Sequence, residues 1–207
     1  ILAALPVAAT HFHAGSLAFA GGNDADAWET AFHEAANRGL TTSFDPNIRA
    51  SLVDDPETYR TRFSRLIASA TLIKLSDEDL AWIYPEQTQE QAMETILVST
   101  SADVVILTKG PAGAEGWTKS AHCAADNPAV PDLVDTIGAG DTFMATILAR
   151  LRDSGRLTGA ALASLTRAEL CQILERGVTA ACLNCAKEGC DPPTATAIED
   201  TMTKGLT

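Results

Sequence analysis

Residues 134–143 contain two glycines and an aspartate whose spacing suits anion chemistry. The stretch reads Val-Asp-Thr-Ile-Gly-Ala-Gly-Asp-Thr-Phe, and apolar residues then recur at helical spacing. Gly138 and Gly140 carry no Cβ, so the backbone N–H groups at the helix start could close on a phosphate, which the helix dipole also favours. Asp141 is then a carboxylate in a site suited to negative charge. It is either a cap of an ordinary helix or a general base beside a transferring phosphoryl group.

The wider string at residues 135–143, Asp-Thr-x-Gly-Ala-Gly-Asp-Thr-Phe, resembles the C-terminal signature of the ribokinase-like (PfkB) carbohydrate kinases. The resemblance implies that Asp141 removes the proton from a sugar hydroxyl. It also implies that the amides of Gly138, Ala139 and Gly140 form an anion hole. The helix-cap interpretation is correspondingly weakened.

A polar turn follows the strand expected over residues 40–44, and open α/β sheets bind ligands at such carboxyl ends. On its own, Asp-Pro-Asn-Ile-Arg is equally consistent with a simple turn in which the proline fixes φ. The pattern Asp-x-Asn-x-Arg resembles one in fructokinases and 2-keto-3-deoxygluconate kinases. It implies that Asp45, Asn47 and Arg49 bind the sugar or the travelling phosphoryl group, a task that suits the planar arginine fork.

The strand expected over residues 71–75 ends in Lys-x-Ser-x-x-Asp, which resembles the Lys-x-Ser-x-x-Glu variant of fructokinases. The resemblance implies that Lys74 and Ser76 lie beside the nucleotide. It further implies that Glu78 or Asp79 serves Mg²⁺ through water. The alternative is that these acids only stabilise a helix start.

Residues 108–113, after a strand expected over 103–107, form a Thr-x-Gly-x-x-Gly loop. Glycine-rich turns after strands are common, so the loop alone is weak evidence. It resembles the family loop along the ATP phosphates and ribose, which implies that Thr108, Gly110 and Gly113 bind the nucleotide.

The last segment, residues 180–194, also resembles that of the family. The resemblance implies that Val178 and Cys182 approach the adenine and that a K⁺ site lies nearby. The implied K⁺ ligands are Asp135 and the carbonyls of Ile137, Asn184, Lys187 and Gly189.

Two further pairs could suggest a metal. His11 and His13 share one face of a strand expected over residues 10–17, and Cys182 and Cys185 are three residues apart on a helix. The histidines have no third ligand nearby, and the cysteines form one pair on a helix without a second pair, so we interpret both as partly or fully buried packing residues.

The remaining elements alternate along the chain. We expect a helix that is capped near Asp24 or Asp26 and stops at Gly39, and another that opens with Asp55 as its cap. Further helices are expected over residues 88–101, 139–152 and 169–187, with short outer strands over 116–123. The resemblance implies a three-layer α/β/α sandwich with a mostly parallel sheet.

The composition excludes several partners. The 207 residues carry a formal charge of −12, which argues against nucleic acid and anionic membranes, and no segment has enough consecutive apolar residues to cross a bilayer. The start has no initiator Met and does not resemble a signal peptide. Five cysteines in an otherwise ordinary composition predict a reducing cytoplasm.

The resemblance extends over nearly all of residues 1–207, which would form the C-terminal, nucleotide-binding and catalytic portion of a single sugar-kinase domain. The first strands, the lid and most sugar contacts would lie in an earlier portion, so we expect this portion alone to be inactive. The expected function is ATP- and Mg²⁺-dependent phosphorylation of a primary sugar hydroxyl, most similar to that of a fructokinase. The alternatives are a 2-keto-3-deoxygluconate kinase, another sugar kinase of the family, or a nucleotide-binding module without chemistry. The partners would be the sugar and ATP, and a homodimer stays open.

Overall fold

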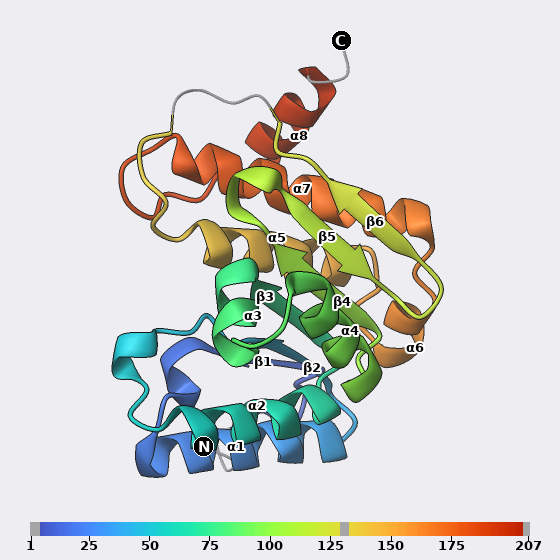
Figure 1. Ribbon diagram of the computed structural model, residues 1–207. Coiled ribbons are helices and arrows are strands. Elements are labelled where there is room, and N and C mark those ends of the chain that lie inside the picture. Colours follow the sequence, from blue (N-terminus) through green and yellow to red (C-terminus); the bar gives the residue numbers. More distant parts are fainter. Residues whose placement is uncertain (1–4, 129–132, 205–207) are drawn as a thin grey trace. The chain divides into compact units, whose positions relative to one another are not determined.

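The computed structural model describes residues 5–128 and 133–204. It contains two compact units. The first unit comprises Ile1–Leu107 and Thr158–Ser164, and the second comprises Thr108–Leu157 and Leu165–Thr207. The α and β labels follow Figure 1.

The first unit carries parallel strands covered by helices. Its strands lie in the order β1-β2-β3-β4. The first two pairs, β1 with β2 and β2 with β3, are parallel, and Gly15 lies opposite Asp45 at the carboxyl end. The strands are β1 His11–Gly15, β2 Thr41–Asp45, β3 Leu72–Ser76 and β4 Val104–Thr108. Every residue of β2 is buried, as expected of a parallel sheet covered on both faces.

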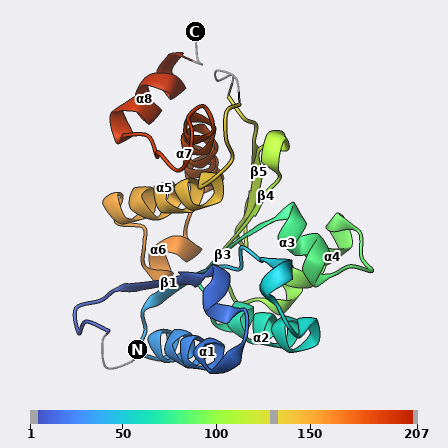
Figure 2. The same ribbon diagram turned by 90° about the vertical axis from the view of Figure 1, so that its left-hand side faces the viewer.

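The helices of this unit follow the strands along the chain. They are α1 Gly22–Asn37, α2 Pro56–Ser69, α3 Asp77–Ile83, α4 Gln89–Ser99 and α6 Gly159–Ala163, with short 3₁₀ helices at Ser16–Phe19 and Ala50–Leu52. Helices α1 and α2 lie side by side in both ribbon views (Figures 1 and 2). Between them and β2, the rings of Phe19, Phe32, Phe44 and Phe63 pack with centroids 5.4–6.5 Å apart, as aromatic clusters prefer.

The second unit consists of a hairpin and three helices. Strands β5 (Ala114–Trp117) and β6 (His122–Ala125) pair antiparallel, and the helices are α5 Ala139–Asp153, α7 Arg167–Cys185 and α8 Ala195–Lys204. Helices α5 and α7 are in close contact (Figure 1). A Cβ on Gly177 would lie 2.7 Å from the ring of Phe143, so glycine permits this approach.

Most of the predicted elements are present, with shifts of a few residues, and the cap of α2 is confirmed, since Asp55 accepts the N–H groups of Glu57 and Thr58. The predicted cap of α1 was wrong. The helix begins at Gly22 after Gly21, without a side-chain cap, and Asp24 lies inside its first turn. The sequence reading omitted α6 and α8, short helices with one buried apolar side chain each, Leu162 and Ile198.

The cysteines differ from the expectation of reduced thiols. Cys123 of β6 and Cys171 of α7 form a disulfide with Cα atoms 5.6 Å apart, which composition alone cannot reveal. Cys182, Cys185 and Cys190 are free. The cytoplasmic location stays a prediction. None of the helices in the described ranges is long and apolar enough to cross a bilayer.

Candidate functional site

The start of α5 presents backbone groups rather than side chains. Gly138 is its N-cap residue with φ +75°, and a Cβ there would lie 2.3 Å from Cys190 Sγ. Both the left-handed backbone and the close contact therefore require glycine. The N–H of Ala139 donates to Thr136 O at 3.2 Å, whereas the N–H groups of Gly138, Gly140 and Asp141 have no partner among the described residues.

The Asp141 side chain is exposed in the first turn of α5. It does not cap the helix, and within the described ranges its carboxylate accepts no hydrogen bond and forms no ion pair. An exposed carboxylate beside free N–H groups can accept a proton from a ligand while the amides hold an anion. The arrangement supports the general-base interpretation over the helix-cap interpretation.

A second cluster in the same unit surrounds Asp135. Its two carboxylate oxygens accept the N–H groups of Ile137 (3.0 Å) and Gly189 (2.9 Å), and these bonds hold the pKa of this carboxyl below its usual range. Asn184 is fully buried and donates from Nδ2 to Ile137 O at 2.8 Å, while Asn184 O accepts Lys187 N at 3.1 Å.

The remaining oxygen of this asparagine is unusual. Asn184 Oδ1 is buried and has no hydrogen-bond partner among the described residues. Buried polar atoms without a partner are rare in folded proteins, so one beside a carboxylate and a carbonyl indicates an unfilled interaction. The structure thus brings together the five residues predicted as cation ligands, Asp135, Ile137, Asn184, Lys187 and Gly189. Gly189 and Lys187 contact the cluster through their N–H groups, and the oxygen left without a partner is the Asn184 side chain rather than its predicted carbonyl. Oxygen ligands of this kind suit a hard cation.

In the first unit, Asp45 and Lys74 bind each other. Lys74 Nζ lies 3.0 Å from Asp45 Oδ2, and both side chains are about 95% buried. The sequence motifs predicted that Asp45 binds the substrate and that Lys74 lies beside the nucleotide. They did not predict that the two side chains form an ion pair. A buried charge needs a charged partner, so each holds the other at the carboxyl ends of β2 and β3.

The turn after β2 is held from within. Asn47 has φ +39°, a left-handed conformation that asparagine tolerates better than most residues. Arg49 is exposed, and its Nη1 donates to Asn47 Oδ1 at 2.6 Å. Nε and Nη2 of this guanidinium have no partner within the described part of the chain, so two donors remain for an incoming anion.

The start of α3 separates the two acids that the sequence could not distinguish. Asp79 is buried, and its oxygens accept the N–H groups of Ile48 (2.7 Å) and Ser76 (3.0 Å). Ser76 Oγ in turn accepts Asp79 N at 3.0 Å, which completes a capping box. Glu78 is exposed, and its carboxylate has no partner among the described residues. The geometry favours Glu78 for a water-mediated contact with a metal.

The glycine-rich loop after β4 is fixed by two contacts. A Cβ on Gly113 (φ +80°) would lie 2.1 Å from Ala125 O, so this position requires glycine. Asn127 Nδ2 donates to the carbonyls of Gly110 (3.1 Å) and Pro111 (3.2 Å). The sequence reading overlooked Asn127, whose contacts are long-range. Thr108 lies at the end of β4, at the start of this loop.

The two residues expected near the adenine, Val178 and Cys182, are buried in α7. Burial, with a smaller contribution from Cys185, raises the pKa of the Cys182 thiol to about 11. The thiol is therefore neutral and acts as a small apolar group. Among the described residues there is no cluster of three His, Cys, Asp or Glu side chains that could hold a metal.

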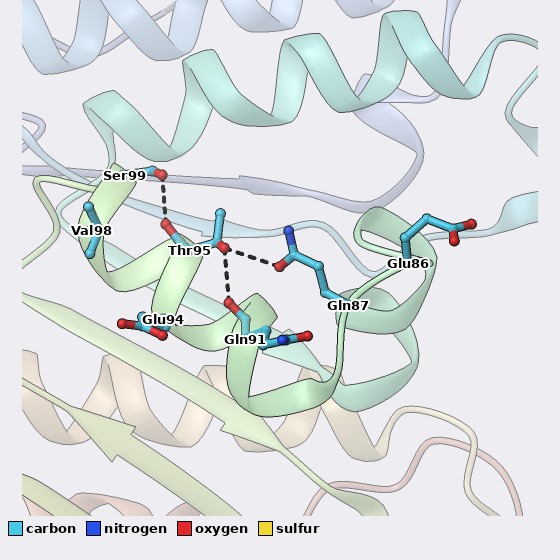
Figure 3. A pocket seen from close by; sticks show the side chains of 7 residues that line it. All are labelled: Glu86, Gln87, Gln91, Glu94, Thr95, Val98 and Ser99. Carbon is cyan, nitrogen blue, oxygen red and sulfur yellow. Dashed lines mark hydrogen bonds between the residues drawn. The ribbon is translucent and has the colours of Figure 1, made fainter.

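A hollow of about 640 Å³ lies in the first unit on and beside α4. It is lined by six polar side chains and by Val98, from the preceding loop and from the helix itself (Figure 3). Thr95 Oγ1 lies within hydrogen-bond distance of Gln87 Oε1 (3.1 Å) and of Gln91 O (2.9 Å). No predicted site residue lies in it.

Comparison with known proteins gives consistent matches. The family model described as "pfkB family carbohydrate kinase" matches residues 3–197. A fructokinase of Rhizobium leguminosarum bv. trifolii is 40% identical over 132 residues, which are 64% of this chain and 39% of the relative. Putative fructokinase-8 of Arabidopsis thaliana is 32% identical over 142 residues, which are 69% of this chain and 67% of the relative.

Solved structures match the fold. A fructokinase of Vibrio cholerae O395, in fructose-, ADP- and calcium-bound form, superposes with TM-score 0.81 at 23% identity and covers 97% of this chain and 64% of that one. A fructokinase of Xylella fastidiosa with bound ATP has TM-score 0.86 at 20% identity and covers 96% and 62%. The chain thus has the ribokinase-like α/β fold predicted from the sequence, and it spans about 40–65% of the length of these bacterial relatives.

Proposed function

Because this chain belongs to the pfkB family of carbohydrate kinases, we propose that the protein transfers the γ-phosphoryl group of ATP to a primary hydroxyl of a sugar, with fructose as the first candidate. The proposal applies to the protein at its natural full length. It draws on relatives named fructokinase and on neighbours solved with fructose, ADP or ATP. In the same terms, we propose that residues 1–207 are the C-terminal, catalytic portion of one kinase domain.

The observation that carries the proposal is the exposed Asp141 carboxylate beside backbone N–H groups at the start of α5, all without a partner among residues 5–128 and 133–204. In the proposed step, an Asp141 oxygen takes the hydroxyl proton as the sugar oxygen bonds to the γ-phosphorus. The bond from that phosphorus to the β,γ-bridging oxygen breaks, and ADP leaves. The N–H groups of Gly138 and Gly140 hold the phosphoryl oxygens, which carry negative charge throughout.

The other residues bind and orient. Arg49 places its free guanidinium nitrogens on the sugar or on the moving phosphoryl group. Thr108, Gly110 and Gly113 lie along the nucleotide phosphates, Ser76 lies beside the nucleotide, and Val178 and Cys182 support the adenine side. Asp45 and Lys74 act through the position of β2 and β3, because they are buried against each other.

The residues present fit two cations. Glu78 is the free carboxylate for Mg²⁺ held through water, and Mg²⁺ would offset negative charge on the nucleotide phosphates. The unpartnered Asn184 Oδ1, with Asp135 and the carbonyls nearby, fits K⁺. At this site, Asp135 and Asn184 hold the loop before α5 against the end of α7 and the loop that follows it.

A substrate panel tests the proposal. ADP release is followed with fructose, other hexoses, ribose and 2-keto-3-deoxygluconate, each with ATP and Mg²⁺. We expect saturable release with fructose exceeding that with the sugar acid, in line with the relatives named fructokinase. Turnover with the sugar acid alone would contradict the fructose assignment. Nucleotide binding without transfer to any member of the panel would contradict the kinase assignment.

A further inference from the structure

Asp79 connects two loops that lie at neighbouring strand ends. One carboxylate oxygen accepts the N–H of Ile48, in the middle of the turn after β2, at 2.7 Å. The other accepts the N–H of Ser76, at the end of β3, at 3.0 Å. The side chain is 5% exposed, so water competes little for these bonds.

The turn that Asp79 contacts is also held by bonds of its own. Asp45, fixed by Lys74, sets where the turn begins, and Asn47 must then adopt φ +39°, which costs free energy for a residue other than glycine. The bond from the Ile48 N–H to Asp79 joins this left-handed turn to α3. The next residue is Arg49, whose guanidinium bonds back to Asn47.

Both oxygens of Asp79 are engaged by amides on the protein side. Because the Asp79 side chain is buried and both of its oxygens already accept N–H groups, it is poorly placed to orient water on a metal, whereas the adjacent Glu78 is exposed. The side-chain length matters as well. The aspartate reaches both Ile48 N and Ser76 N from the third position of α3, and one added methylene would displace the bond to the turn.

We propose that Asp79 is a positioning residue, which sets the place of Arg49 through the N–H of Ile48, and that it does not serve the metal. The inference rests on the proposed function for the role of Arg49, but the restraint on Ile48 is independent of it. Displacement of about 1 Å in a positioning group can cost roughly 100-fold in rate.

The test compares Asp79→Asn with Glu78→Gln in the full-length protein. Asp79→Asn keeps the shape of the side chain but replaces one carboxylate oxygen with an NH₂ group, which cannot accept a hydrogen bond from the N–H that it faces. We expect kcat to fall about 10- to 100-fold, while the Mg²⁺ concentration for half-maximal rate changes less than twofold. Glu78→Gln should instead raise that Mg²⁺ concentration. A rise in the Mg²⁺ requirement with Asp79→Asn, or an unchanged kcat, would overturn the proposal.

A double-mutant cycle identifies the route through Arg49. In an Arg49→Ala background, Asp79→Asn should lower kcat by less than threefold, because the group that it positions is already gone. An undiminished further loss would show that Asp79 acts elsewhere. Gln91→Ala is the matched control for the loss of a capping box. Gln91 and Thr88 form a capping box at the start of α4, as Asp79 and Ser76 do at α3, and Gln91→Ala should leave kcat unchanged.

Hydrogen exchange makes the inference independent of activity. The Ile48 amide should be protected in the wild type and should exchange at least tenfold faster in Asp79→Asn. If Asp79→Asn does not fold, Asp79→Glu replaces it, with the same loss of Ile48 protection expected. Equal protection in wild type and variant would refute the proposed restraint. Protection lost as expected in a protein that phosphorylates no sugar would refute the proposed function while leaving the restraint intact.

Discussion

The turn after β2 and the start of α5 present two different kinds of binding surface. In the turn, the functional side chains are already bound to one another, Asp45 to Lys74 and Arg49 to Asn47. At the start of α5 the groups available are backbone N–H donors and one exposed carboxylate, Asp141, with no partner in the part of the chain that the structure describes. The first region is held in place before any ligand arrives, while the second keeps its hydrogen-bonding capacity for the ligand.

This difference predicts how each region responds to substitution. Where side chains hold one another, removal of one shifts its neighbours, and the effect on rate comes through geometry. Where a single free carboxylate acts on the substrate, its removal takes away a chemical step and leaves the surroundings in place. Substitutions of similar size should therefore affect rate, binding and stability in different proportions.

The largest effect is expected for Asp141→Asn. The amide is isosteric but cannot accept the hydroxyl proton, so kcat should fall on the order of 10²- to 10⁴-fold while the ATP affinity changes little. Sugar-dependent ADP release and calorimetry with ATP and Mg²⁺ measure the two quantities. Asp153→Asn, at the exposed far end of the same helix, is the matched control and should keep the wild-type rate. A loss below threefold for Asp141→Asn would remove this carboxylate from the mechanism.

Arg49→Lys should have a smaller effect. Lysine keeps the charge but loses the planar fork that bonds Asn47 and leaves two donors for the ligand, so we expect kcat to fall about tenfold. Arg38→Lys, an exposed arginine at the end of α1, serves as control. If Arg49→Ala folds and turns over at the wild-type rate, the segment after β2 is only a turn.

The smallest effect is expected for the pH dependence of stability and concerns His11 in β1, the edge strand of the first unit. His11 bonds Thr41 and Ser43 through its two ring nitrogens, and burial, then the nearby His13, lowers its pKa from 6.5 to about 4. The unfolded chain therefore binds more protons than the folded one between these pH values. The stabilisation that neutral His11 allows should be complete above pH 6.5. The free energy of unfolding should therefore fall as the pH drops from 6.5 toward 4.

The size of this fall is on the order of 1–3 kcal/mol, less than the full pKa shift would give because the ring is only partly buried. Urea unfolding at pH 7 and pH 4.5, for the wild type and for His11→Gln, isolates the contribution of His11. The variant should lose less stability than the wild type on acidification. Equal losses would mean that the proton balance of His11 does not change on folding.

The sequence predicted most of the fold because local patterns were strong there. Apolar residues marked β3 and β4, and Asp55 with Pro56 marked the start of α2. The start of α1 was missed because its cap is a glycine backbone, which leaves no side-chain signal.

The site was only partly predictable for a physical reason. Family motifs indicated Asp141, Asn47 and Arg49 directly, because each motif is short and contiguous. The partners that decide what a residue can do come from distant segments, as Lys74 does for Asp45 and Ile48 does for Asp79. Such contacts depend on packing across strands, and residue spacing along the chain does not encode them.

The chemical nature of the product shows whether the protein transfers a phosphoryl group to a primary sugar hydroxyl. Full-length protein is incubated with ATP, Mg²⁺ and fructose, and the mixture is followed by phosphorus NMR. We expect ADP together with a sugar phosphate whose phosphorus couples to the two protons of a CH₂ group, because the acceptor is a primary hydroxyl. This signal should be absent with Asp141→Asn. Release of inorganic phosphate alone, or a phosphate ester on a ring CH carbon, would contradict this expectation.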